Sequence, residues 1–182
     1  ILITLRRFAM GMEQTAAIIV AILTPLSPYL IKAGEAVAGE AGKAIFNQVK
    51  TLYEIVHTRF EENNDQPGQH AMDELKENPE AVRELLSEHI VAEAKADPEF
   101  AQALSAQVED LRILLFECLE RKFRTEDLEE IYFRMGIGWD DLAGGEVGRR
   151  RKAMALIEYV EIKEKVPELI AAMWKVYPGL KC

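Results

Sequence analysis

The chain has 182 residues, of which 49% are hydrophobic, so it can form one domain or two small ones with an apolar core. Its formal net charge of −9 disfavours nucleic-acid binding by the whole chain, and we expect no nucleic-acid partner. The acidic excess lies in residues 61–106, between a slightly basic first segment and a last segment of mixed charge. Two cysteines, Cys118 and Cys182, favour a reducing cytoplasm over a secreted disulfide scaffold.

The spacing of apolar residues predicts an all-α fold. These residues recur three or four positions apart along the chain, as on one face of a helix. We expect an N-terminal helical bundle followed by a small second bundle. The two units are placed at about Met12 to Ala106 and Val108 to Pro178, with the boundary near Ser105 to Glu109.

The start of the chain carries two ambiguous segments. Met12 has the character of a natural start, so residues 1–11 are read as foreign sequence or an extended reading frame, with a secretory signal as the weaker alternative. Gln14 to Ile31 has no charge and is close to the shortest length that spans a membrane. It is either a buried or partner-facing core helix or a membrane-inserting one. Four side chains would make the contact in either case: Ile18, Ile19, Ile22 and Leu23.

Further signals mark helices in the first unit. Gly34, Ala38 and Gly42 share one helix face and allow close approach of another helix, in a long helix expected to continue to Phe60. Glu61 to Gln69, with Pro67-Gly68, predicts a loop. The dipeptides Asn78-Pro79 and Asp97-Pro98 each predict a helix start, because a capping side chain precedes proline in the first turn.

The second unit shows four helical segments. An apolar seam opens it, formed by Leu111, Leu114, Leu115, Cys118 and Leu119. Thr125 is expected to cap the next helix, and Gly136 to end it with a left-handed backbone. A third helix follows the basic run Arg149 to Lys152, and a fourth opens at Val166-Pro167. We expect six side chains to be buried together: Leu115, Leu119, Leu128, Ile131, Leu156 and Ile157.

The order of packing residues in this unit resembles the bacterial effector-associated domains, which are small death-domain-like helical adaptors. The resemblance covers Leu111 to Pro178. It rests on Leu114-Leu115, Phe123, Leu128, Ile131-Tyr132-Phe133, Met135-Gly136-Ile137, Trp139, Leu142, Gly148, Lys152-Ala153, Leu156-Ile157, Tyr159-Val160 and Pro167-Glu168-Leu169-Ile170. It implies a death-like bundle that assembles through protein contacts. The loop Gly144 to Gly148 and the three arginines after it depart from the family pattern, so the choice of partner does not carry over.

The first unit, from Ala16 to Leu104, resembles the Bell or HeLo-like helical bundles of membrane-targeting cell-death effectors. The resemblance rests on Leu26, Pro28-Tyr29-Leu30, Ala33-Gly34-Glu35-Ala36, Ala41-Gly42, Leu52-Tyr53, Glu77-Asn78-Pro79 and Asp97-Pro98-Glu99. It implies that the apolar N-terminal helix is the executing segment.

The sequence contains no motif that indicates catalysis. His57, His70 and His89 are scattered, and Glu54-x-x-His57 has di-iron ligand spacing without a second such pair. There is no CxxC pair, no Gly-x-Ser-x-Gly and no P-loop. We therefore expect no enzymatic activity, no metal, no cofactor and no small-molecule substrate.

Charge patterns indicate how the second unit assembles. The basic run is Arg149, Arg150, Arg151 and Lys152, and the acidic candidates to face it in a neighbour are Glu126, Asp127, Glu129, Glu130, Asp140 and Asp141. Oppositely charged faces on one small unit allow head-to-tail contacts that build rings or filaments. Reversing Arg150 and Arg151 should abolish this assembly, and reversing Glu129 and Glu130 as well should restore it in part.

These patterns favour a non-enzymatic bacterial conflict or cell-death signalling protein, of the kind that acts in anti-phage immunity. It would assemble with itself or with a protein carrying a related adaptor, in the cytoplasm or recruited to the inner membrane, and its N-terminal helices would act on membranes. The alternative is a soluble helical scaffold that recruits an effector through homotypic contacts.

Overall fold

Helices form every regular element that the computed structural model describes, which covers residues 11–32, 43–75, 77–144 and 147–176. No strand occurs in these ranges, so the predicted all-α class is confirmed. In chain order the helices are α1 (Met12–Lys32), α2 (Lys43–Glu62), α3 (Gln66–Glu74), α4 (Pro79–Ala96), α5 (Pro98–Lys122), α6 (Thr125–Arg134), α7 (Arg149–Ile162) and α8 (Val166–Val176).

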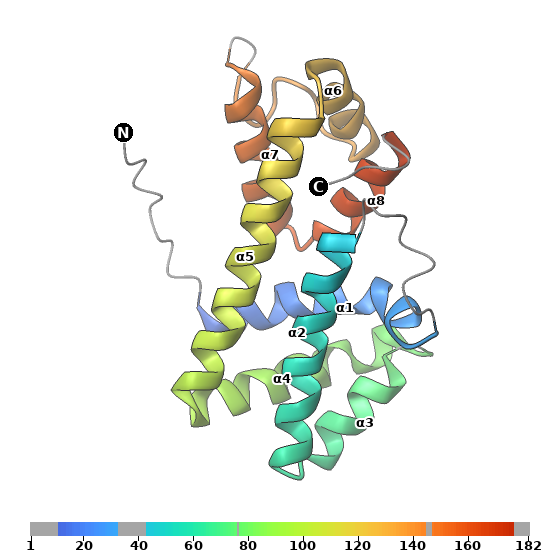
Figure 1. Cartoon of the computed structure of the whole chain (residues 1–182), viewed down its shortest axis with the longest axis vertical. Helices are drawn as coiled ribbons and strands as arrows, with labels where there is room; N and C mark the ends of the chain where they lie inside the picture. Colours follow the sequence, from blue (N-terminus) through green and yellow to red (C-terminus); the bar gives the residue numbers. More distant parts are fainter. Residues whose placement is uncertain (1–10, 33–42, 76, 145–146, 177–182) are drawn as a thin grey trace.

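The longest of the described helices, α5, extends along the molecule from the α4 end to the α6 and α7 end (Figure 1). Its start follows from the sequence, since the Asp97 carboxylate accepts hydrogen bonds from the backbone N–H groups of Glu99 (2.8 Å) and Phe100 (3.3 Å). These bonds hold the pKa of Asp97 below its ordinary value. One face of α5 is buried along its whole length and packs against α2, α4, α1 and α7.

The boundary expected near Ser105 to Glu109 falls inside α5, which continues through it without a break. One cluster of buried apolar side chains includes residues of both expected units, from Ile18 in α1 to Met173 in α8. A continuous helix is possible here because Leu104, Val108 and Leu111 keep the apolar face in register across the join. The two groups of helices therefore share α5 and a continuous core.

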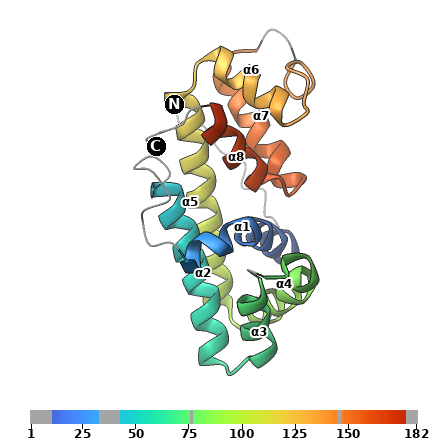
Figure 2. The same ribbon diagram turned by 90° about the vertical axis from the view of Figure 1, so that its right-hand side faces the viewer.

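Helix α1 lies at the middle of the molecule, with α6, α7 and α8 above it and α3 and α4 below it (Figure 2). It packs against α4, α5, α8 and α2. Ile18, Ile19, Ile22 and Leu23 are all buried in the core. Within the described residues, no helix is both long enough and apolar enough to cross a membrane.

Two features predicted for the first unit are a loop, which the structure describes, and a stripe of small residues, which it does not. The loop predicted for Glu61 to Gln69 is shorter, because α3 begins at Gln66 and the Asp65 carboxylate accepts a hydrogen bond from the Gly68 N–H (3.1 Å). An Asp followed by proline in the first turn is a helix-start signal, and it outweighs the loop tendency of Pro67-Gly68. The stripe Gly34, Ala38 and Gly42, and the long helix through it, lie outside the described residues; α2 is described from Lys43.

Candidate interaction surface

The helices α6, α7 and α8 form a small bundle at the upper end of α5, and its core matches the sequence expectation. All six side chains predicted to be buried together are buried in the same apolar cluster: Leu115, Leu119, Leu128, Ile131, Leu156 and Ile157. Tyr132 adds a polar link, because its buried hydroxyl donates a hydrogen bond to the Lys152 carbonyl oxygen (2.8 Å). Burial raises the pKa of Tyr132 to about 12. This core holds α6 and α7 in a defined relative position.

Lys152 faces the interior, whereas the sequence placed it beside the arginines of the basic run. Its side chain is fully buried, and its ammonium donates a hydrogen bond to the Trp139 carbonyl oxygen. The same nitrogen lies 4.5 Å from the centroid of the Trp139 ring and 3.5 Å from the Asp140 carboxylate. Helical geometry explains the difference, since Lys152 shares the inner face of α7 with Leu156. Lys152 and Asp140 are therefore satisfied within the chain.

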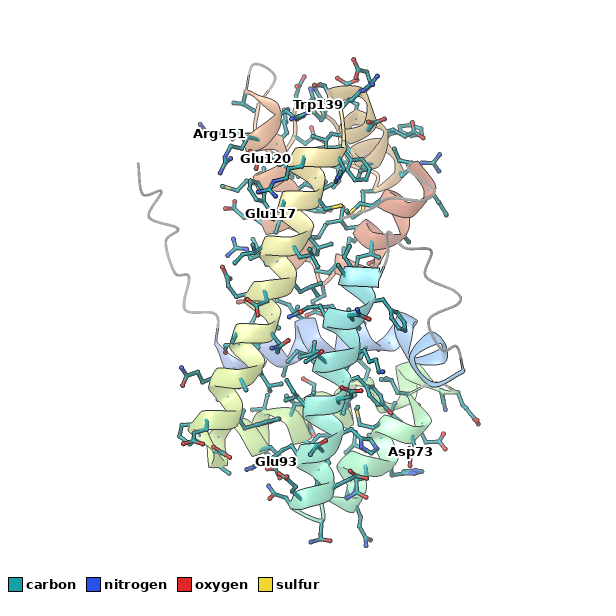
Figure 3. All side chains as sticks on the ribbon, viewed as in Figure 1. Asp73, Glu93, Glu117, Glu120, Trp139 and Arg151 are labelled. Atoms are coloured by element: carbon teal, nitrogen blue, oxygen red, sulfur yellow. The ribbon has the colours of Figure 1, made fainter. Side chains whose placement is uncertain are left out.

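The three arginines at the start of α7 differ in their surroundings. Arg149 donates a hydrogen bond to the Phe123 carbonyl oxygen (2.9 Å), and Arg150 is ion-paired with Glu120. Arg151 is exposed and forms no ion pair within the described part of the chain. Figure 3 shows Arg151 on the same side of the molecule as Glu120. Arg151 is thus the arginine with most freedom to meet an anionic group outside the chain.

The acidic candidates also separate into two groups. Asp127 accepts a hydrogen bond from the Arg124 N–H (2.7 Å), so Arg124 takes the N-cap position and Thr125, which we expected there, is the first helical residue. Asp141 accepts a hydrogen bond from the Gly138 N–H (2.8 Å). Both carboxylates stabilise local backbone. Gly136 has φ +70°, which confirms the predicted left-handed end of α6.

The remaining carboxylates of α6 form an acidic face on its solvent side. Glu126, Glu129 and Glu130 follow one another at helical spacing, and Glu130 is ion-paired with Arg134 at 2.7 Å. Phe133 continues the same face and is 79% exposed. We call these four residues the α6 face. In the family resemblance Phe133 counts only as a packing residue, although the buried positions of α6 at Leu128, Ile131 and Tyr132 leave it on the outer side.

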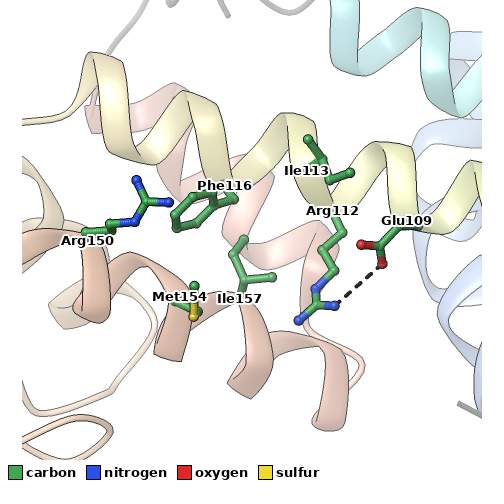
Figure 4. Close-up of a pocket in the computed structure, with 7 residues that line it drawn as sticks. All are labelled: Glu109, Arg112, Ile113, Phe116, Arg150, Met154 and Ile157. Carbon is green, nitrogen blue, oxygen red and sulfur yellow. Dashed lines mark hydrogen bonds and ion pairs between the residues drawn. The ribbon is translucent and has the colours of Figure 1, made fainter. Parts of the chain in front are cut away.

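A groove lies between α5 and α7, on the side of the bundle that carries Arg150 (Figure 4). It has a volume of about 100 Å³, and its floor is apolar. A wider hollow of about 590 Å³ adjoins it along α7 and is lined in part by Arg151. Arg150 and Met154 border both, so we call the combined depression the α5–α7 groove. No local sequence pattern predicts this groove, because it forms only where two helices distant in sequence meet.

An ion pair between a partly exposed arginine and a buried glutamate lies at one end of this groove. The Arg112 guanidinium of α5 lies 3.1 Å from the Glu161 carboxylate of α7 and 3.5 Å from that of Glu109. Burial raises the pKa of Glu161 to about 7; Arg112 opposes this shift, while Glu109 and Glu158 add to it. The pair links α5 to α7 beside the apolar floor.

The extent of this bundle coincides with a known family. Residues 111–178 match the model of Effector-associated domain 7. The match begins inside α5 and covers α6, α7 and α8, well under half of the chain. It therefore assigns a family to this effector-associated region and leaves the first four helices without one. The chain has no match among curated proteins and none among solved structures.

The effector-associated region also contains the charged residues proposed from the sequence as interaction candidates, whereas the histidines lie in the helices before it. His57 is 3.5 Å from the Glu61 carboxylate, Glu54 is ion-paired with Lys50, and His89 lies 2.7 Å from Asp65. Across the described ranges, no group of three His, Cys, Asp or Glu side chains is arranged to hold a metal ion.

Proposed function

We propose that this chain is a non-enzymatic adaptor of a bacterial conflict or cell-death system, which assembles through its effector-associated region. The assembly would join copies of the chain, or the chain and an effector that carries a related region. The observation that carries this proposal is the presence of two oppositely charged exposed surfaces, at Arg151 and on the α6 face, within the stretch that matches Effector-associated domain 7.

Charge explains why such an adaptor assembles conditionally. Each exposed ion pair contributes only about 0–1 kcal/mol, so several must form together. Their attraction is screened over about 10 Å at 0.1 M salt and about 3 Å at 1 M. Assembly through these surfaces therefore depends on protein concentration and weakens as salt rises.

Sedimentation velocity of the full chain tests this proposal, over a range of concentrations at 0.05 M and 1 M salt. The expected result is a set of species larger than the monomer at low salt that dissociates at high salt. A chain that is monomeric at every concentration, and that binds no protein carrying a related region, contradicts it.

A second candidate function is action on a membrane by α1. This candidate is favoured by the contact of α1 with α8, which connects a helix that has no charged residue from Gln14 to Ile31 to the effector-associated region. Because Ile18 to Leu23 is buried in the core, α1 must leave its site before it can insert into lipid. Assembly that disturbs α8 would be the trigger.

Dye leakage from anionic vesicles separates the two functions. The adaptor function alone predicts assembly without leakage. Membrane action predicts leakage that requires assembly and disappears when α1 is joined to α4 by an engineered disulfide. The reduced form of that variant is the matched control, since it has the same side chains without the constraint.

A further inference from the structure

Phe133 is the most exposed large apolar side chain of the described residues, at 79%, followed by Ile162 at 68% and Ile113 at 43%. Burying this exposed aromatic ring against a partner would remove apolar surface from water, which favours association. Around it stand the carboxylates of the α6 face. A surface complementary to the α6 face is therefore an apolar depression with a basic border.

The α5–α7 groove has this chemistry at its Arg150 and Arg151 end, whereas Glu109 and Glu158 line other parts of the combined depression. Its floor is formed by Phe116, Met154 and Ile157, and Ile113 borders it with part of its side chain in solvent. Arg150 lies over the Phe116 ring, 5.3 Å from the centroid. Arg151 lines the adjoining hollow beside the N-terminus of α7, where the helix dipole also attracts carboxylates. The groove of about 100 Å³ accepts part of a ring, and the hollow beside it leaves room for the rest.

The two surfaces lie on different helices, and Phe133, which is 79% exposed, lines neither the groove nor the adjoining hollow. In Figure 1, α7 lies to the left of the upper end of α5 and α6 lies to its right. One copy cannot fill its own groove with its own Phe133 unless the bundle rearranges. Two copies can, and the contact then uses different patches on each partner, which is the geometry that continues into rings or filaments.

We propose that Phe133 of one copy inserts into the α5–α7 groove of a second copy, with Glu126 and Glu129 next to Arg151 of that copy. The occupant of the groove is thus a second chain of this protein. This inference rests on the proposed self-association and names the apolar anchor that the charged surfaces guide into place. Aromatic anchors of this kind carry a large share of binding energy, whereas charges at the border set orientation and rate.

Sedimentation velocity with four variants of the full chain tests the inference. Phe133→Ala removes the anchor, and Met154→Glu places a carboxylate on the groove floor. Ile113→Glu is a second groove variant at a more exposed site, which keeps the test valid if Met154→Glu does not fold. Ile162→Ala is the control, because it removes an exposed apolar side chain that lines neither surface. Circular dichroism verifies that each variant is folded.

The expected result is that Phe133→Ala and the groove variants weaken self-association by at least about thirtyfold, while Ile162→Ala assembles like the unaltered chain. A mixture of Phe133→Ala with a folded groove variant then forms a complex of two chains and nothing larger, because each partner retains one complementary surface.

Each other outcome has a defined meaning. If the unaltered chain assembles and Phe133→Ala assembles equally well, the inference is overturned and the proposed self-association stands. If both single variants are monomeric and their mixture is too, the contact is not head-to-tail and the inference is also overturned. If the unaltered chain is monomeric throughout, self-association itself is refuted.

Discussion

The ammonium nitrogen of Lys152 lies 4.5 Å from the centroid of the Trp139 ring, in a position closed to solvent. The Trp139 carbonyl oxygen accepts a hydrogen bond from the same ammonium. The indole ring meets the Tyr132 ring edge-on, with 5.1 Å between the two ring centroids. A buried charge is costly unless it is hydrogen-bonded and paired, and here a carbonyl oxygen, an aromatic face and Asp140 compensate it. The contact fastens the turn around Trp139 to α7.

Replacing Lys152 by Met tests this contact. Methionine keeps much of the buried volume but removes the charge and the donor to the Trp139 carbonyl, so we expect a loss of roughly 1–3 kcal/mol in the free energy of unfolding. Urea denaturation measures it. Arg151→Met is the matched control on the adjacent, exposed position and should change stability by less than about 0.5 kcal/mol. Equal effects of the two changes would contradict the role of Lys152.

Leu115→Ala tests the core of the effector-associated region. Leu115 is 2% exposed and lies on α5 within the shared apolar cluster. Truncation leaves a cavity that the surrounding helices fill only in part, so the expected cost is about 2–5 kcal/mol. Thermal and urea unfolding report it. A loss below about 0.5 kcal/mol would mean that α5 does not pack as described.

The Arg112–Glu161 pair predicts a pH-dependent stability. The folded-state pKa of Glu161 is raised from 4.5 to about 7, so the folded chain binds a proton on this carboxyl that the unfolded chain releases at lower pH. Stability from this group is therefore present below pH 4.5 and lost as pH rises to about 7. The glutamine in the Glu161→Gln variant has no proton to release in this pH range, so the variant does not lose this stability as pH rises.

The measurement is the difference in unfolding free energy between Glu161→Gln and the unaltered chain at pH 5 and pH 8. We expect this difference to shift in favour of the variant by roughly 1–3 kcal/mol at the higher pH. Using the difference removes the contribution of carboxylates such as Asp97, whose pKa is lowered by backbone hydrogen bonds and which act in the opposite direction. A difference independent of pH would show that Glu161 is charged throughout this range.

Charge reversal tests the electrostatic part of assembly. Of the two arginines chosen from the sequence for reversal, only Arg151 is suitable, because Arg150 is already paired with Glu120. Of the two glutamates, Glu129 is the suitable one, because Glu130 is paired with Arg134. Each single reversal should weaken self-association at low salt by roughly five- to tenfold, and the double variant should recover part of it. Lys163→Glu, at the other end of α7, makes the same charge change outside both surfaces and should have little effect. Unchanged particle size in Arg151→Glu would exclude a role for this charge.

Local patterns in the sequence were sufficient to predict the helical class, the starts of α4 and α5, and the buried faces of α6 and α7. These features depend on residues within a few positions of each other: Asp97 caps its own helix, Gly136 ends its own helix, and Leu156 follows Lys152 by one turn. Such signals are short-range, so they can be read without knowledge of the rest of the chain.

Contacts between distant helices decided the rest. Lys152 belongs to a run of four basic residues, yet the Trp139 turn covers it. The apolar helix α1 is a core helix because α4, α5 and α8 surround it. No break separates the two groups of helices, because α5 belongs to both. The α5–α7 groove likewise exists only between Phe116 and Met154, which are far apart in sequence. The periodicity of a sequence predicts which face of a helix is apolar. Only the packing of the helices determines what covers that face and which apolar side chains, such as Phe133, remain exposed.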